Sequence, residues 1–197
     1  MKQELLIGIT ESGVMHTDAD PPISLDTKFQ MVKESGVYDY FDKTPPLELE
    51  DDYRRCSEKY ELPILAGGWF YVLGRDEDLL MENLRLGARL GSLVHNTQII
   101  MDHQDGSLVS DEQVVEIYLR AYETGEACGC RPTFEVHVNM WSEDFRRIEK
   151  VADLVEKQGI PFRMTLDHSH VIFKIDNPRE QEVFNIRESI ENGDLVL

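Results

Sequence analysis

The chain has 197 residues and a formal net charge of −18 at pH 7, with 41% hydrophobic and 29% charged residues. This length suits a single domain, residues 1–197, that can bury a sizeable core. Because the negative charge repels phosphate backbones and anionic lipid surfaces, we expect no nucleic acid and no membrane among its partners.

The N-terminus and the cysteines both indicate a cytoplasmic protein. The first residues, Met-Lys-Gln-Glu-Leu-Leu, lack the features of a signal peptide, and no apolar run approaches transmembrane length. The three cysteines, Cys56, Cys128 and Cys130, do not have the usual spacing of a zinc or redox motif. We therefore expect free thiols in a reducing compartment.

Short apolar runs alternate with amphipathic stretches along the chain. The runs that predict strands lie at residues 5–9, 37–41, 63–71, 93–101, 134–139 and 162–167. Apolar residues three or four positions apart predict helices at residues 26–35, 47–60, 78–90, 110–125, 145–159 and 177–190. Residues 193–197 could lead into another strand.

Several helix ends carry recognisable signals. Ser110 and Gln113 form a capping-box pattern, and Gly36 and Gly91 follow the last apolar residue of their helices. Gly125 is expected to stop the helix that begins at Ser110.

Six strand–helix units, each about 30 residues long, predict a parallel sheet covered by helices. A doubly wound sheet would be apolar on both strand faces, and no glycine-rich phosphate motif follows the first strand. The alternative is an α/β TIM barrel, (β/α)8, whose active site lies at the carboxyl ends of the strands. Polar groups follow the strands here, which favours the barrel. Because a complete barrel has eight units, we expect the last two strands to be missing from this chain.

Two strands carry ionisable groups on one face only. Glu135 and His137 alternate with the apolar residues Phe134 and Val136, and Asp167 ends a strand of the same kind and is followed by His170. Carboxylates with one or two imidazoles suit Mn²⁺, Mg²⁺ or Zn²⁺. The alternative is that the two carboxylates form internal salt bridges, for example with Arg163, and that the histidines lie on the surface. Since buried carboxylates are rare without a partner or a metal, we favour a divalent metal ion held by Glu135 and Asp167.

Glu-x-His at the end of the fifth strand and Asp-x-x-His at the end of the sixth resemble the xylose isomerase-like TIM barrels. That family includes sugar phosphate isomerases and epimerases, dehydratases and family 2 AP endonucleases. The resemblance implies that Glu135 and Asp167 are metal ligands, and that a histidine and a glutamate of two further strands complete the site. It also implies catalytic or substrate-contacting roles for His137 and His170, and a possible homo-oligomer.

We therefore expect a metal-dependent isomerase or epimerase that acts on a sugar or polyol through a metal-stabilised enediolate. The catalytic residues would be Glu135, His137 and His170, and Trp69 and His103 would contact the substrate. A dehydratase related to the 3-dehydroshikimate or inosose enzymes, and a truncated barrel that only binds a partner, remain alternatives. Glu11 and His95 are interpreted as exposed surface groups.

Overall fold

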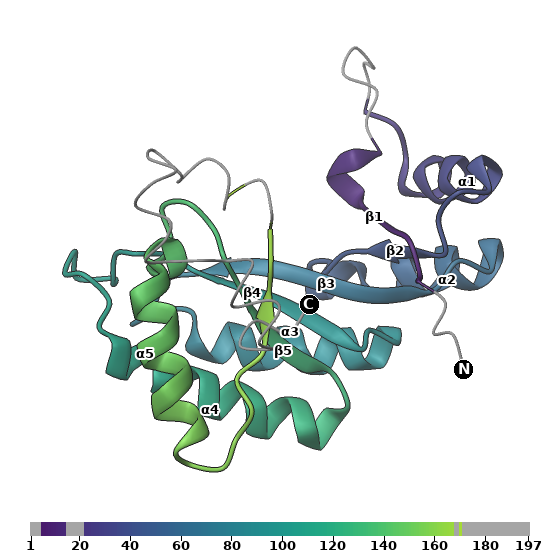
Figure 1. The fold of residues 1–197 in the computed structure, drawn as a ribbon. Helices are drawn as coiled ribbons and strands as arrows, with labels where there is room; N and C mark the ends of the chain where they lie inside the picture. Colours follow the sequence, from purple (N-terminus) through teal and green to yellow (C-terminus); the bar gives the residue numbers. More distant parts are fainter. Residues whose placement is uncertain (1–4, 15–21, 168–169, 171–197) are drawn as a thin grey trace.

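The computed structural model describes residues 5–14, 22–167 and 170 (Figure 1). Within them, six parallel strands form one sheet in sequential order, with β1 and β6 at its two ends. The strands are β1 (Gly8–Thr10), β2 (Tyr40–Asp42), β3 (Ile64–Tyr71), β4 (Val94–Ile99), β5 (Arg131–Glu135) and β6 (Met164–Thr165). The helices are α1 (Leu25–Ser35), α2 (Glu50–Tyr60), α3 (Glu77–Leu90), α4 (Asp111–Cys128) and α5 (Phe145–Glu156), with short 3₁₀ turns η1 (Glu11–Gly13), η2 (Leu47–Leu49) and η3 (Trp141–Glu143).

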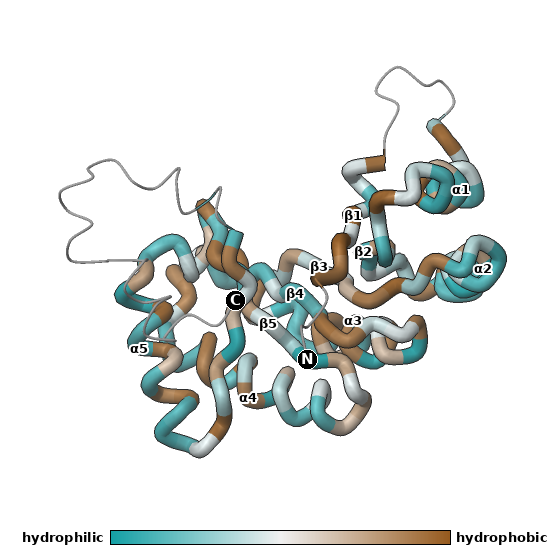
Figure 2. Tube along the Cα trace, turned by 45° about the vertical axis from the view of Figure 1, so that its right-hand side comes forward, coloured by the Kyte–Doolittle hydropathy of each residue, from teal (hydrophilic) through white to brown (hydrophobic). Residues whose placement is uncertain are grey.

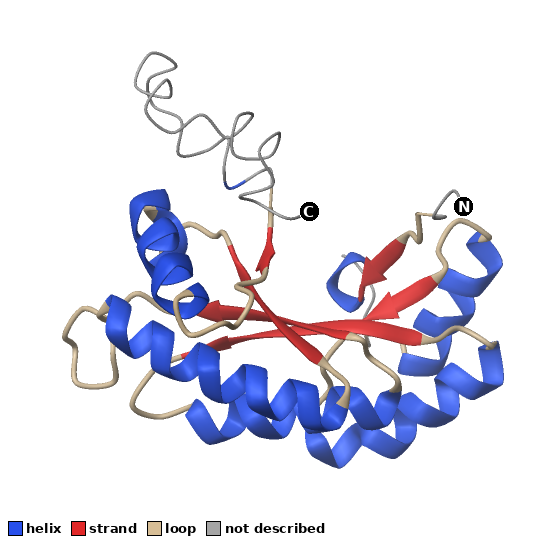
Figure 3. Ribbon diagram, turned by 60° about the horizontal axis from the view of Figure 1, so that its bottom comes forward, coloured by secondary structure: helices blue, strands red, loops and turns tan. Residues whose placement is uncertain are grey.

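The sheet curls, and all five α-helices lie on its convex side (Figure 3). The described residues thus form a half-barrel of six consecutive parallel strands joined through five α-helices, in agreement with the prediction of an incomplete TIM barrel. The helices alternate apolar and polar segments along their length, as expected when one side of each helix packs against a sheet (Figure 2). The concave side is the inner face of the half-barrel, and the side chains that point to it decide what the protein can bind.

Two apolar clusters hold the helices to the sheet. The larger lies between α3, α4 and α5 and the strands β3 to β6, and it includes Leu80, Leu84 and Tyr118, all fully buried. The smaller lies between α1, α2 and the first three strands, where the rings of Phe29 and Phe41 stack with centroids 4.4 Å apart. Burying one such side chain contributes about 2 kcal/mol, so the outer face of the sheet carries most of the hydrophobic stabilisation.

The helix α4 shows where a sequence signal was interpreted wrongly. Its capping box forms as predicted, with Ser110 and Gln113 each accepting from the other's backbone N–H. The helix continues past Gly125 to Cys128 and ends at Gly129, which has a φ of 88°. A Cβ at Gly125 would lie 2.5 Å from the carbonyl oxygen of Cys130. Gly125 is therefore needed for close backbone packing, and Gly129 supplies the left-handed C-cap.

Some predicted elements cannot be compared with the structure. The helix predicted at residues 177–190 and the tail at 193–197 lie outside the described residues. The described cysteines are free, with Cys56 and Cys130 buried. None of the helices in the described ranges combines the length and apolar character that a membrane span requires.

Candidate metal and active site

The carboxyl ends of β5 and β6 bring together the groups singled out in the sequence. Phe134 and Val136 point into the apolar core and are fully or almost fully buried, so the alternating residue Glu135 faces the concave side. Glu135 is in register with Thr165 of β6, and the chain reaches Asp167 two residues later. Parallel strands present their carboxyl ends at the same edge, which is why residues 32 positions apart meet here.

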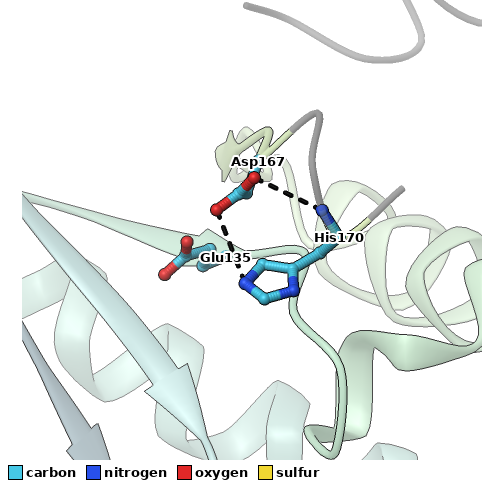
Figure 4. Close-up of side chains that lie close together, drawn as sticks. All are labelled: Glu135, Asp167 and His170. Atoms are coloured by element: carbon cyan, nitrogen blue, oxygen red, sulfur yellow. Dashed lines mark hydrogen bonds and ion pairs between the residues drawn. The ribbon is translucent and has the colours of Figure 1, made fainter. Parts of the chain in front are cut away.

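Glu135, Asp167 and His170 form a cluster on this edge (Figure 4). One ligand atom from each residue lies within 4.8 Å of the others. His170 Nε2 lies 3.5 Å from Asp167 Oδ2, and the His170 backbone N–H donates to Asp167 Oδ1 at 3.4 Å. Two carboxylates and one imidazole are the donor types that Mn²⁺, Mg²⁺ and Zn²⁺ accept, so these three residues could hold a divalent ion.

The Glu135 carboxylate is fixed by two side-chain amides of β4. Asn96 Nδ2 donates to Glu135 Oε2 at 2.7 Å, and Gln98 Nε2 donates to the same oxygen. Glu135 is only 7% exposed, and its backbone carbonyl accepts from Ser142 Oγ. Both amides bind Oε2, so Oε1 is left to face the neighbouring groups. Hydrogen bonds of this kind orient a ligand before a metal binds.

His137 lies beside the cluster, with its ring against that of His170 at a centroid distance of 3.7 Å. Its Nδ1 is 2.7 Å from the carbonyl oxygen of Val138. A carbonyl can only accept, so in the neutral ring Nδ1 carries the proton and Nε2 is the acceptor. The structure therefore brings His137 to the site with a ring nitrogen that can take up a proton.

Arg163, the partner considered for an internal salt bridge, points elsewhere. Its guanidinium lies 3.6 Å from Glu126 Oε1 and 5.2 Å from the centre of the Tyr122 ring, both on α4. Glu135 instead accepts from the neutral amides of Asn96 and Gln98. The salt-bridge alternative for Glu135 is therefore not what the structure shows.

The structure places Trp69 on the other side of the sheet from the cluster. Trp69 lines an outer cavity of about 300 Å³ together with Thr44 and Asn83. Phe70, its neighbour on β3, takes the inner face, and its ring meets that of His137 edge-on at 5.9 Å. Period-two alternation puts only one of the two rings on each face. The aromatic group that the structure brings to the cluster is Phe70.

His103 lies on the loop after β4 and contacts other loop residues. Its Nδ1 is 3.1 Å from Asp105 Oδ1. Its ring packs against Gly74, where a Cβ atom would lie 2.5 Å from the His103 Cε1. No contact with the Glu135 cluster is recorded for His103 in the described part of the chain. Its role as a substrate contact stays a prediction.

Two residues interpreted as exposed are in fact enclosed. His95 is 1% exposed and lies between Thr44 and Tyr71, with Nδ1 3.2 Å from the Thr44 hydroxyl and Nε2 2.7 Å from the Tyr71 hydroxyl. Burial lowers the pKa of His95 to about 3, so the ring is neutral. Glu11 is bound by Lys28, Lys43 and the Tyr53 hydroxyl at 2.7, 2.9 and 2.9 Å.

The sequence analysis did not identify Asn96 and Gln98, the residues that orient Glu135. A signal was present, because they alternate along β4 as polar residues of one face. It was obscured by His95 and Thr97, which are also polar but are buried on the opposite face. Which face of a strand is the inner one is decided by the neighbouring strands and not by the strand's own sequence.

Comparisons with known proteins agree on the fold. No protein-family model matches the sequence, and no curated protein matches it. A structure of 3-keto-D-glucoside 4-epimerase from E. coli matches with a TM-score of 0.64 at 13% identity, covering 94% of this chain and 76% of that chain. A xylose isomerase domain protein from Planctomyces limnophilus matches with a TM-score of 0.58 at 10% identity, covering 85% and 64%.

A third match has a metal. It is the IolI protein with a bound zinc atom, with a TM-score of 0.57 at 14% identity, covering 80% of this chain and 62% of that chain. At these identities the likeness establishes the fold, and the predicted resemblance to xylose isomerase-like TIM barrels is confirmed at that level. The chain spans between 62% and 76% of the length of these three proteins.

Proposed function

We propose that this chain belongs to a divalent-metal-dependent isomerase or epimerase that moves a proton next to the carbonyl of a sugar or polyol-derived substrate. The observation that supports this most directly is the cluster of Glu135, Asp167 and His170 at the carboxyl edge of a half-barrel. Among the proteins of similar fold, one is named as a sugar epimerase and one contains zinc, and both features support the proposal.

The residues of the cluster fit a metal ion. His170 turns Nε2 towards the two carboxylates, and this nitrogen lies 3.5 Å from Asp167 Oδ2 (Figure 4). An imidazole nitrogen that faces two carboxylates completes a donor set that suits a divalent ion. Glu135, Asp167 and His170 would hold the ion, which would polarise the substrate carbonyl and stabilise the negative charge that develops on its oxygen.

The side chains next to the cluster have roles that do not depend on a bound metal ion. Asn96 and Gln98 keep one Glu135 oxygen occupied, which limits how the carboxylate can turn. His137 offers Nε2 as a proton acceptor, because Nδ1 donates to the Val138 carbonyl. Phe70 stands edge-on to His137 and offers an apolar ring to the C–H groups of a sugar.

The experiment is proton exchange on the full chain with Mn²⁺ added. A panel of ketohexoses, including D-fructose, is incubated in D₂O with the wild type, Glu135→Gln and the control Glu58→Gln. Glu58 is an exposed residue of α2, so its substitution changes the charge equally but not the site. Mass spectrometry and NMR then report whether deuterium enters next to the carbonyl and whether water is lost.

We expect the wild type and Glu58→Gln to exchange one proton for deuterium, and Glu135→Gln to lose both exchange and Mn²⁺ affinity by about 10- to 100-fold or more. Loss of water from the substrate would favour the dehydratase alternative. Exchange that persists in Glu135→Gln with unchanged Mn²⁺ affinity would refute the assignment of the site. Metal binding without exchange on any substrate would favour a binding role.

A further inference from the structure

A second carboxylate, Asp42, shares the inner face with Glu135. Phe41, the residue before it, is fully buried among Phe29 and Tyr53 on the helix side of β2. Alternation along β2 therefore puts Tyr40 and Asp42 on the inner face. The position of Tyr40 agrees with this, because its ring lies where a Cβ at Gly8 of the neighbouring strand would project, 2.2 Å away.

Beside Asp42 and beside Asn96, β3 presents only small residues to the inner face, and its large inner-face side chain, Phe70, comes two residues after Gly68. Asp42 is in register with Ala66 of β3, and Gly68 of β3 is in register with Asn96 of β4. Gly68 and Ala66 share the inner face, since Trp69 between Gly68 and Phe70 points outwards. A Cβ at Gly68 would lie 3.0 Å from Asn96 Cβ and 2.9 Å from its backbone oxygen. Only glycine lets Asn96 keep its place.

Unused hydrogen-bonding groups border this stretch of the inner face. Asn96 donates its amide N–H to Glu135, and its other end, Oδ1, is buried without a hydrogen-bond partner among the described residues. No hydrogen bond to the Asp42 carboxyl is recorded among the described residues. Burial raises the pKa of Asp42, and the Glu135 carboxylate raises it further, as expected for two carboxyl groups that face the same space. A buried acceptor and a half-buried carboxyl on the same face of the sheet call for donors from a ligand.

We propose that Asp42 and Asn96 Oδ1 form a hydroxyl-binding subsite that holds hydroxyl groups of a polyhydroxylated substrate next to the metal ligands. The ligand class is a polyol or sugar, because each hydroxyl can donate to one of these oxygens and accept in turn. Gly68 and Ala66 leave β3 flat where the carbon chain would cross. The choice of a sugar or polyol as ligand rests on the proposed function. Hydroxyl binding at this subsite does not depend on the proposed reaction, because it needs no carbonyl group in the ligand.

The test separates binding from reaction by using ribitol, a five-carbon polyol without a carbonyl. Ribitol binding to the Mn²⁺-loaded full chain is measured by calorimetry for the wild type, Asp42→Asn and the control Glu58→Gln. Mn²⁺ affinity and D-fructose exchange are measured on the same samples. Asp42→Asn keeps the shape of the side chain, removes its charge and replaces one of its two acceptor oxygens by an N–H donor.

We expect Asp42→Asn to weaken ribitol binding by about 10- to 100-fold, as for the loss of a hydrogen bond to a charged acceptor. Mn²⁺ affinity should stay within about twofold of the wild type, and Glu58→Gln should bind ribitol as the wild type does. Equal ribitol affinity in the wild type and Asp42→Asn, or no ribitol binding by the wild type, overturns the subsite. Ribitol binding that depends on Asp42, without exchange on any sugar, supports the subsite and contradicts the proposed reaction.

Discussion

The carboxylate of Glu11 offers a direct test of how the first two strands are held to their helices. Glu11 follows β1 and is 15% exposed, and it binds Lys28 of α1, Lys43 after β2 and the hydroxyl of Tyr53 on α2. Its desolvation is outweighed by hydrogen bonds from the two lysines and Tyr53, which lower the pKa of Glu11 from 4.5 to about 2. One carboxylate therefore joins four elements of the chain.

The magnitude follows from the difference between the two pKa values. At 1.36 kcal/mol for each pH unit, the fall from 4.5 to about 2 corresponds to about 3 kcal/mol of folding stability. Lys43 is 27% exposed, so solvent weakens its interaction with the Glu11 carboxylate. We therefore expect Glu11→Gln to lower the free energy of unfolding by about 2–3 kcal/mol at pH 7. The folded-state pKa is the lower one, so this stability is present above pH 4.5 and is lost as the pH falls towards 2.

The assay is urea unfolding of the wild type, Glu11→Gln and the exposed control Glu58→Gln at pH 7 and again at pH 3. The difference between wild type and Glu11→Gln should shrink by about 2 kcal/mol between these pH values, because most of that carboxylate's contribution is lost by pH 3. Glu58→Gln should stay within about 0.5 kcal/mol of the wild type. A Glu11→Gln protein as stable as the wild type at pH 7, or a difference that does not change with pH, would refute the reasoning.

Three further results are expected. His137→Ala should reduce proton exchange more than Mn²⁺ affinity, measured by D₂O exchange and calorimetry; the reverse order would make His137 a metal ligand. Gly125→Ala should lower the free energy of unfolding by about 1–3 kcal/mol, because its Cβ would lie 2.5 Å from the Cys130 carbonyl oxygen, and an unchanged urea midpoint would contradict that close approach. Tyr71→Phe should cost about 1–3 kcal/mol, because it leaves Asn83 and His95 without their partner at 2.8 and 2.7 Å; equal stability would mean that water replaces the hydroxyl.

The sequence was most informative about elements with strong local signals. The apolar stripe predicted for α4, from Val114 to Ala121, is buried, and the capping box at Ser110 forms. The strand ends with Glu135 and Asp167 were located from period-two alternation, and the cluster that they form with His170 confirms that the three groups meet. These features depend on spacing within one element, which a sequence displays directly.

The sequence was less informative where a residue's role depends on its neighbours in space. Trp69 and Phe70 are adjacent and both aromatic, yet only Phe70 faces His137. His95 was interpreted as a surface residue and is buried and neutral between the sheet and α3. Glycine was interpreted as a helix stop at Gly125, where it permits close packing instead. In each case the deciding contact comes from another part of the chain.

The sequence by itself determined that strands and helices alternate along the chain, and that Glu135, Asp167 and His170 come at strand ends, because helix and strand periodicities follow from local pattern. Only the tertiary structure decided which face of each strand is the inner one. It thereby selected Asn96 and Gln98 to orient Glu135 and brought Asp42 into the same space. The physical reason is that the curl of the sheet and the packing of its helices are set by contacts between strands, which no single stretch of the sequence contains.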